Sequence, residues 1–540
     1  MISLQGKGAS AGIAAGKLFF LDRSAFVVQK KIITDSDGEL QRFHAARKQS
    51  AEQLSALSES MKAQLGEEHA LLFEIHAMML EDSDFVDPIV KIIETEKLCA
   101  EYAVETSGAR LAREFAEMDD EYMSARAADV LDVSKRLIAV LSGTQQDSSS
   151  WSEPRIIASD DFTPSETAQF DRTKVLALVS QAGATNSHTA IFARTMGIPA
   201  IIGLGASLSG ALSGKEAVLD GEKGILHIEP SDAVKKELNE KKERLSKEKE
   251  LLEKFRGKET VSKSGKKLKL YANIGSVTDA DAALAGDAEG IGLFRSEFLY
   301  LGRDDFPDEN IQFESYKKVV EKMSGRQVII RTLDIGADKQ ADYFNLPHEE
   351  NPALGMRAIR ICLTRPPLFK TQLRAIYRAS AFGNAAIMFP MISSVEELLR
   401  AKKIAAEARD ELAKEGVKFN PKTPIGIMIE TPASVIISDL LAKEADFFSI
   451  GTNDLTQYTL AIDRQNETIA EFCDTHHEAI IRMIRMTNEN AEKAGIWCGI
   501  CGMLGADPTL TETFVNMGLA ELSVEPSVIL KLRGRIAEMG

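Results

Sequence analysis

The sequence predicts a multidomain α/β protein whose carboxyl-terminal half is a TIM (β/α)8 barrel. Eight short apolar segments recur after about residue 262 with helical sequence between them, and about 280 residues is the size such a barrel needs. The segments are 268–274, 290–295, 328–334, 386–392, 426–430, 447–451, 496–501 and 521–524. Before them, residues 30–141 place apolar side chains at helical spacing with little glycine, which predicts an acidic helical bundle.

The remaining segments predict an α/β region and a helix that leads from it to the barrel. Residues 1–20 are small and glycine-rich and predict one or two strands. Strands are also expected at 155–159 and 175–179, with a closing hairpin at 217–219 and 224–228. The strongly charged run 231–256 predicts an exposed helix that connects this α/β region to the barrel.

Composition narrows the classes of function. A chain of 540 residues has room for about three or four domains, and 44% hydrophobic with 27% charged residues is ordinary for globular protein. The net charge of −16 argues against nucleic-acid or anionic-membrane partners and is compatible with a basic protein partner. We expect no membrane span, because no run of about 18 apolar residues occurs. Five cysteines, a sparse and odd count, predict a reducing compartment, and we expect a cytoplasmic protein.

Chemically active side chains gather where a TIM barrel keeps its active site, at the carboxyl ends of the predicted strands. Arginines there can clamp phosphate and carboxylate oxygens, and hard carboxylate ligands suit Mg²⁺. Each residue alone has a structural alternative, such as an arginine paired inside the barrel, but together they favour a small, highly anionic substrate. In strand order they are Asn273, Arg295, Arg331, Asp334, Lys339, Glu430, Asn453, Asp454, Arg464 and Cys501.

Two other patterns resemble metal or redox sites. Cys498 and Cys501 form a C-x-x-C, but no second pair exists, and a three-residue offset on a strand points the two thiols to opposite faces. The run 474–478, with His476 and His477, is expected to cap a helix and face solvent.

His188 follows a loop of small residues and opens an apolar helical run. That position is a helix amino terminus, where free N–H groups favour a phosphate, and an imidazole nitrogen can attack phosphorus. Read without knowledge of motifs, a capping loop with an incidental histidine is the better interpretation. No G-x-x-x-x-G-K-[ST] phosphate loop occurs, and Gly203-Leu-Gly205 predicts only a turn.

Several segments together resemble the Enzyme I family of the bacterial phosphoenolpyruvate-dependent sugar phosphotransferase system. They are 163–169, 187–189, 292–299, 331–339, 351–361, 427–432, 451–458 and 463–466, and the resemblance covers essentially the whole chain. It implies that His188 is phosphorylated by phosphoenolpyruvate and that the phosphoryl group passes to a histidine of the phosphocarrier HPr. It also implies roles for barrel residues: substrate contacts by Arg295, Arg331, Asn453 and Arg464, Mg²⁺ ligation by Glu430 and Asp454, and protonation of the pyruvate enolate by Cys501.

The resemblance also implies an architecture. Residues 1–20 and 144–229 would form the phosphohistidine α/β domain, with an inserted helical HPr-docking domain at 21–143. A linker helix at 230–260 would lead to the phosphoenolpyruvate-binding barrel at 261–540, which would form a homodimer. Since His188 must reach both the barrel and HPr, a large swivel of its domain is implied.

The sequence departs from the family pattern at three positions. Ala184 and Asn186 stand where the family has glycine and threonine before the histidine, and Met503 stands where it often has glutamate. These departures keep open a non-catalytic or regulatory homologue with impaired phosphotransfer. Relatives that make phosphoenolpyruvate with ATP need a further ATP-binding domain, and a nitrogen-regulating branch usually has an extra sensor domain; neither matches the helical first 140 residues or so.

Overall fold

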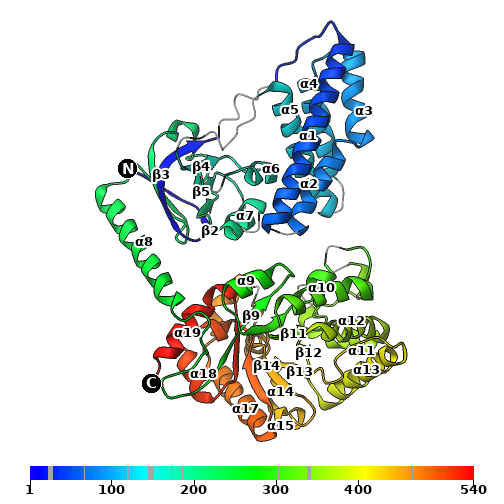
Figure 1. The fold of residues 1–540 in the computed structure, drawn as a ribbon, viewed down its shortest axis with the longest axis vertical. Helices are drawn as coiled ribbons and strands as arrows, with labels where there is room; N and C mark the ends of the chain where they lie inside the picture. The colour runs from blue at the N-terminus through cyan, green and yellow to red at the C-terminus, as the bar shows by residue number, and fades with distance from the viewer. Residues whose placement is uncertain are drawn as a thin grey trace. The chain divides into compact units, whose positions relative to one another are not determined.

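The computed structural model describes the chain apart from residues 22–27, 66, 118–120, 144–150, 152, 172, 184–186, 302, 337–341 and 465. It divides into two compact units, Met1–Glu248 and Lys249–Gly540. The division falls within helix α8 (Asp232–Glu253), drawn in green in Figure 1. Each unit is described by itself below.

The first unit contains the predicted helical bundle. Its main helices are α1 (Ser36–Leu65), α2 (Glu67–Met79), α3 (Ser83–Lys91), α4 (Ala100–Ala116) and α5 (Glu121–Ser142). Helices α1 and α2 pack together, as do α4 and α5, and α1 also contacts α5. Fully buried side chains such as Phe43, Ile89 and Leu137 fill the space between the helices. In the chain the bundle lies between two adjacent, parallel strands of one sheet, β3 and β4.

That sheet has eight strands in the order β1-β8-β7-β3-β4-β5-β6-β2. Their bounds are β1 Ile2–Gln5, β2 Lys7–Ser10, β3 Ile13–Phe20, β4 Arg155–Ser159, β5 Val175–Ser180, β6 Ala200–Ile202, β7 Glu216–Asp220 and β8 Ile225–Ile228. Strands β4 and β5 and the β7–β8 hairpin lie where the sequence predicted them. Helices α6 (Pro164–Ala168) and α7 (His188–Met196) follow β4 and β5.

The first 20 residues form three strands, so the prediction of one or two was too low. Strand β1 pairs with β8 and β2 pairs with β6, which places them at opposite edges of the sheet. The chain changes edge at Gly6, where a Cβ would collide with the Ile202 carbonyl. Glycine permits this close backbone approach.

The second unit is a closed barrel of parallel strands in the order β9 to β16, which confirms the predicted TIM barrel. The strands are β9 Lys269–Ile274, β10 Gly290–Phe294, β11 Gln327–Arg331, β12 Ala385–Phe389, β13 Ile425–Ile429, β14 Phe447–Ile450, β15 Trp497–Ile500 and β16 Glu521–Val524. Around them lie α9 Asp279–Ala285, α10 Glu309–Lys322, α11 Ile359–Thr364, α12 Pro366–Ala379, α13 Val395–Lys414, α14 Pro432–Ile436, α15 Ser438–Leu441, α16 Thr452–Leu460, α17 Glu478–Ala494, α18 Thr511–Met517 and α19 Ile529–Glu538.

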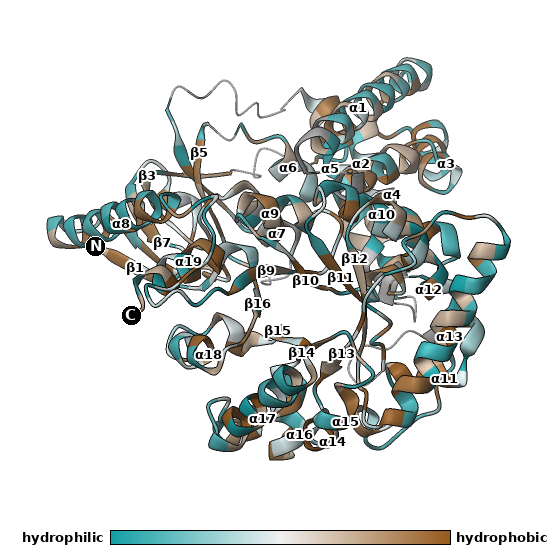
Figure 2. Cartoon of the chain, turned by 60° about the horizontal axis from the view of Figure 1, so that its bottom comes forward, coloured by the Kyte–Doolittle hydropathy of each residue, from teal (hydrophilic) through white to brown (hydrophobic). Residues whose placement is uncertain are grey.

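Alternation along the barrel strands separates two cores. Outward side chains such as Leu270, Ile330 and Leu522 pack under the helices, and the strands in Figure 2 are correspondingly apolar. A smaller cluster fills the barrel interior, where the Phe447 and Trp497 rings stack with centroids 4.7 Å apart. This interior cluster also contains Cys501, whereas Cys498 belongs to the outer core.

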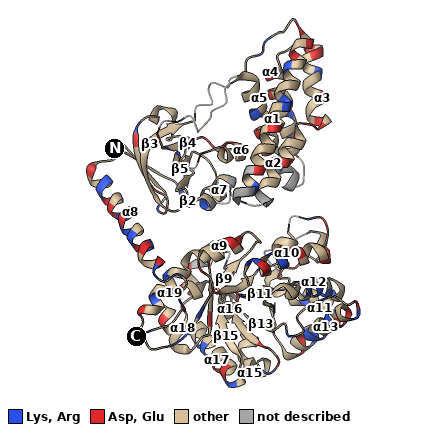
Figure 3. Cartoon of the chain, viewed as in Figure 1, with Lys and Arg blue, Asp and Glu red and all other residues tan. Residues whose placement is uncertain are grey.

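Helix α8 is the charged connecting helix that the sequence predicted, and acidic and basic side chains follow one another along it in Figure 3. Of its residues only Leu238 is buried. Lys241 pairs with Asp220 at 2.7 Å and Glu222 at 2.9 Å, which ties the helix to the β7–β8 turn. Within the described residues, no helix has the length and apolar character needed to cross a bilayer. All five cysteines are free thiols.

Candidate functional site

The predicted site residues of the second unit come together at the carboxyl ends of the barrel strands. Arg295 directly follows β10, Arg331 ends β11 and Glu430 directly follows β13. Asp454 lies in the first turn of α16 after β14, and Cys501 directly follows β15. Because all strands of the barrel are parallel, these ends share one rim.

A buried network of charges joins three of these strand ends. Arg331 contacts Glu297 at 2.7 Å and Asp334 at 2.8 Å. On the other side of Asp334, Arg357 contacts its second carboxylate oxygen at 2.9 Å. Arg357 also reaches Asp454 at 3.3 Å. The network therefore fixes the positions of two guanidinium groups and three carboxylates before any ligand arrives.

Arg357 was not among the predicted site residues. It lies between the short helical turn Pro352–Leu354 and α11 rather than at a strand end, and its Nη1 donates to the Tyr458 hydroxyl at 2.9 Å. The segment 351–361 had carried part of the family resemblance, which was the available signal for it. Glu297 was also missed, because an acidic residue in a short helical turn gives no sign of burial.

The charges in this network shift one another's titration. Burial, and then the neighbouring Asp454 and Asp334 carboxylates, raise the pKa of Glu430 to about 8. Burial alone would lower the pKa of Arg331 and Arg357, but the adjacent carboxylates, Asp334 foremost, hold both above their usual range. Two permanent cations therefore face three acids, one of which is easily protonated.

Glu430 and Asp454 are suited to hold a divalent cation. Oε1 of Glu430 accepts a hydrogen bond from the Met391 backbone N–H at 2.6 Å. Asp454 Oδ1 is buried and has no hydrogen-bond partner among the described residues. The Arg464 guanidinium lies 3.4 Å from that oxygen without a hydrogen bond, so the oxygen keeps its capacity to ligate a cation. No group of three or more His, Cys, Asp or Glu side chains in the described part of the chain could hold a metal.

The predicted substrate-binding side chains differ in how many bonds they already make to other residues of the protein. Arg295 is half-buried directly after β10, and its side chain has no hydrogen bond or ion pair with another described residue. Arg464 approaches Asp454 at 3.4 Å, and Asn453 Oδ1 accepts from the Met503 backbone N–H at 3.1 Å. The Asn273 amide donates to the carbonyls of Cys501 and Ser523, each at 3.1 Å, which makes it a structural clamp.

Cys501 lies inside the rim and is 3% exposed. Burial raises the pKa of its thiol to about 12, although the Ser449 hydroxyl beside it acts in the opposite direction. The sulfur contacts the Ile450 carbonyl at 3.7 Å. The thiol is therefore protonated at neutral pH and can give a proton to a carbanion at the rim. Its side chain and that of Cys498 point to opposite faces of β15, as the three-residue offset predicted.

In the first unit, helix α7 begins at His188, as predicted from the sequence. Ser187 is its N-cap, and the Ser187 hydroxyl accepts from the Ala190 N–H at 3.3 Å. The imidazole of His188, residues Ala184 and Asn186, and Lys339 of the barrel lie outside what the structure describes. The free backbone donors of a nine-residue helix start favour an anion at this place.

The start of α7 is braced by the helical bundle through α6. Asp132 of α5 accepts from the Ser165 hydroxyl at 2.6 Å and from its backbone N–H at 3.1 Å. A capping box between Thr163 and Glu166 fixes the first turn of α6. Thr189 then donates to the Phe162 carbonyl at 3.4 Å, which ties α7 to the loop before α6.

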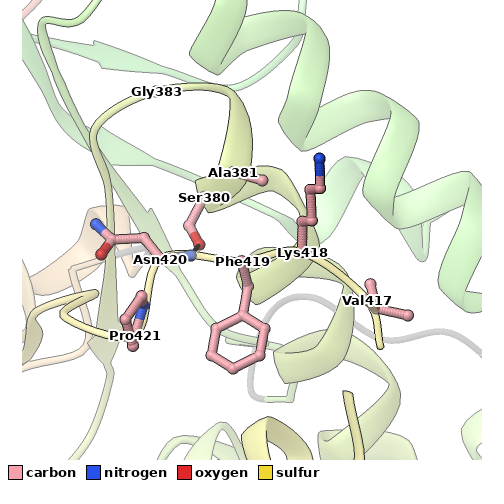
Figure 4. A pocket seen from close by; sticks show the side chains of 8 residues that line it. All are labelled: Ser380, Ala381, Gly383, Val417, Lys418, Phe419, Asn420 and Pro421. Carbon is pink, nitrogen blue, oxygen red and sulfur yellow. Dashed lines mark hydrogen bonds between the residues drawn. The ribbon is translucent and has the colours of Figure 1, made fainter. Parts of the chain in front are cut away.

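Two remaining features of the barrel do not form an active site. His477 is the N-cap of α17, as predicted. His476 Nε2 forms a hydrogen bond with Asp507 Oδ2 at 2.6 Å. A hollow of about 630 Å³ near the amino-terminal ends of β12 and β13 is lined by uncharged residues and Lys418 (Figure 4). Across it the Asn420 N–H donates to the Ser380 hydroxyl at 2.9 Å.

Comparison with known protein families agrees with this geometry. Residues 249–540 match the PEP-binding domain of PEP-utilising enzymes, 151–224 match their mobile domain and 5–126 their N-terminal domain. The PEP-binding model alone covers more than half of the chain, so the chain is a PEP-utilising enzyme.

The relatives specify the family further. The phosphoenolpyruvate-protein phosphotransferase of Priestia megaterium is 42% identical over 99% of this chain and 94% of its own length. That of Bacillus subtilis is 42% identical over 100% of this chain and 95% of its own length. The chain belongs to the phosphoenolpyruvate-protein phosphotransferase family. A solution structure of Enzyme I is 31% identical and covers 45% of this chain and 99% of its own, with a TM-score of 0.40.

Proposed function

We propose that the chain transfers the phosphoryl group of phosphoenolpyruvate to its own His188 and then to a histidine of HPr, releasing pyruvate. The observation that carries this proposal is the rim of the barrel, where carboxylates fix Arg331 and Arg357 beside the end of β10, which carries Arg295. A doubly anionic phosphate beside a carboxylate needs several oriented cations, and this rim supplies them.

The roles of the rim residues follow from their surroundings. Arg295, Arg331, Asn453 and Arg464 would bind the phosphate and carboxylate oxygens of the substrate. His188, at the start of α7, would attack phosphorus with a neutral ring nitrogen, so that the N–P bond forms as the bond to the enolate oxygen breaks. The Cys501 thiol would then donate its proton to C3 of the enolate and give pyruvate.

Mg²⁺ fits the carboxylates at the rim, and we assign Glu430 and Asp454 as its ligands. The support for this assignment is that burial and the Asp454 carboxylate raise the pKa of Glu430, and that Asp454 Oδ1 accepts no hydrogen bond from a described residue. When bound, the metal would supply positive charge next to the transferring phosphoryl group. Arg357 and Asp334 would orient Asp454, since Arg357 bonds both carboxylates.

We also propose a docking domain for HPr, a dimer interface and a cellular location. The bundle is the proposed HPr-docking domain, because Asp132 couples it to α6 and so to the start of α7. The barrel is proposed to form a homodimer; exposed apolar side chains such as Leu354, Ile436 and Phe472 are available for it. Free thiols at all five cysteines are compatible with the reducing cytoplasm that we propose as its location.

A comparison of the full chain with the fragment 1–260 tests the division of labour between the two units. The fragment, which contains His188 but no barrel, should accept phosphate from phospho-HPr and not from phosphoenolpyruvate. His188→Ala should remove both reactions from the fragment and leave its circular dichroism spectrum unchanged. Labelling of the fragment by phosphoenolpyruvate would show that the barrel is not the substrate site.

A non-catalytic regulator is the competing function, motivated by Asn186 and Met503. Phosphorylation of His188 distinguishes the enzyme from the regulator, because a regulator would bind HPr without forming a phosphohistidine. The retained network of Arg331, Glu430 and Asp454 favours the enzyme.

A further inference from the structure

Glu521, the first residue of β16, is a buried acid that the proposed mechanism does not use. It is 2% exposed, and both of its carboxyl oxygens lack a hydrogen-bond partner among the described residues. Leu522 and Val524 of the same strand lie in the outer core, so alternation turns Glu521 and Ser523 into the barrel interior. A buried carboxyl group without partners costs free energy, which calls for a functional reason.

The barrel leaves a specific space for this carboxyl group. A Cβ on Gly499 of β15 would collide with Glu521 Oε2, and a Cβ on Gly292 of β10 would collide with Oε1. These glycines flank the acid from two different strands. Any side chain at either position would fill the place that the carboxyl group occupies.

The same register places the acid directly below the reactive thiol. Gly499 is paired with Glu521 between β15 and β16. Cys501 is two residues further along β15 and points to the same interior face as Gly499. A strand advances about 3.3 Å per residue, so the Gly499–Glu521 pair lies about 7 Å before Cys501 along the strand direction. Glu521 and Cys501 thus occupy successive inward-facing levels of the barrel interior.

The electrostatic surroundings keep the acid neutral. Burial raises the pKa of Glu521 well above its ordinary value, and only Lys269 acts against this shift. Negative charge on Glu521 would in turn raise the pKa of Cys501 and of Tyr271, the nearby groups on β15 and β9. A protonated acid is therefore stored inside the barrel, on the side of Cys501 away from the rim.

We propose that Glu521 is the proton partner of Cys501 and returns a proton to its thiolate after each turnover, an inference that rests on the proposed function. The S–H bond of Cys501 breaks as the C3–H bond of pyruvate forms. The O–H bond of Glu521 then breaks as the S–H bond is restored, and the carboxylate takes a proton from water. Glu521 acts through Cys501 and does not touch the substrate.

The variant Glu521→Gln tests this role, because the amide has the same shape and no acidic proton. Two rates are measured on the full chain with Mg²⁺. One is the single-turnover phosphorylation of His188 by phosphoenolpyruvate, and the other is exchange of the pyruvate methyl protons with D₂O, followed by NMR. We expect phosphorylation within about twofold of the wild type and exchange slowed about a hundredfold, the lower end of the range of general acid–base effects.

Two further variants serve as controls, one that restores an acid at position 521 and one that changes an exposed glutamate. Glu521→Asp restores an acid and should recover part of the exchange rate, whereas Glu538→Gln, the same change at an exposed residue in the last turn of α19, should leave both rates unchanged. Exchange at the wild-type rate in Glu521→Gln would overturn the proposal. Equal loss of both rates would also overturn it, because Glu521 would then only support the fold. If the wild type itself takes no phosphate from phosphoenolpyruvate, the proposed function fails and this inference fails with it.

Discussion

The raised pKa of Glu430 gives a quantitative prediction for Mg²⁺ binding. Its ordinary value is 4.5 and its value in the folded, metal-free protein is about 8, so ionising it near pH 4.5 costs about 5 kcal/mol at about 1.4 kcal/mol per unit. A cation must displace this proton when Glu430 ligates it. The apparent Mg²⁺ affinity should therefore rise about tenfold per pH unit, or about a hundredfold from pH 6 to 8, and level off above.

Calorimetric titration with Mg²⁺ at pH 6, 7, 8 and 9 measures this dependence. Repeating each titration in two buffers of different ionisation enthalpy counts the protons released, and about one per metal is expected at pH 6. Glu430→Gln should abolish the steep pH dependence together with most of the binding, while Glu538→Gln, at an exposed residue in the last turn of α19, should bind as the wild type does. An affinity that is constant between pH 6 and 8 would refute the reasoning.

The same pKa shift has a consequence for stability, with a definite sign. The folded metal-free protein binds a proton at Glu430 between pH 4.5 and about 8, and the unfolded chain does not. This contribution is fully present below pH 4.5 and is lost as pH rises through about 8. Without Mg²⁺, the barrel of the wild type should lose stability relative to Glu430→Gln across this range in chemical denaturation.

Three other substitutions test separate parts of the site. Ser187→Ala removes the N-cap of α7 and should lower stability of the first unit by about 1 kcal/mol in thermal denaturation; an unchanged melting curve would contradict the cap. Arg357→Met leaves Asp334 and Asp454 without their shared cation and should destabilise the barrel by about 3–5 kcal/mol, whereas Arg357→Lys should cost less. Cys501→Ser should keep phosphorylation of His188 by phosphoenolpyruvate but stop exchange of pyruvate methyl protons with D₂O; wild-type exchange would remove Cys501 from proton transfer.

Most residues of the rim could be predicted from the sequence, because the end of each strand is marked by a change from apolar to polar residues. Apolar segments bounded by polar residues marked each barrel strand within a few positions, and the parallel arrangement then placed Arg331, Glu430 and Cys501 on one rim. Alternation along β15 also predicted that Cys498 and Cys501 would face apart. These conclusions depend only on local periodicity and on the known geometry of the fold.

Residues placed by tertiary contacts could not be found in the same way. Arg357 belongs to an irregular segment and reaches Asp334 and Asp454 only through folding. The environment of Glu521 depends on glycines from two other strands, which no local pattern reveals. The three short strands of the first 20 residues pair with distant partners at both sheet edges, so their number was underestimated.

The central claim, phosphoryl transfer from phosphoenolpyruvate to His188, is tested most directly by labelling the substrate. Purified full-length protein is incubated with Mg²⁺ and phosphoenolpyruvate that carries label in its phosphoryl group, and the labelled peptide is mapped. The proposal predicts one acid-labile, alkali-stable label per chain on His188, which is lost to HPr on its addition. Absence of label from folded protein, or label on any other residue, would contradict it.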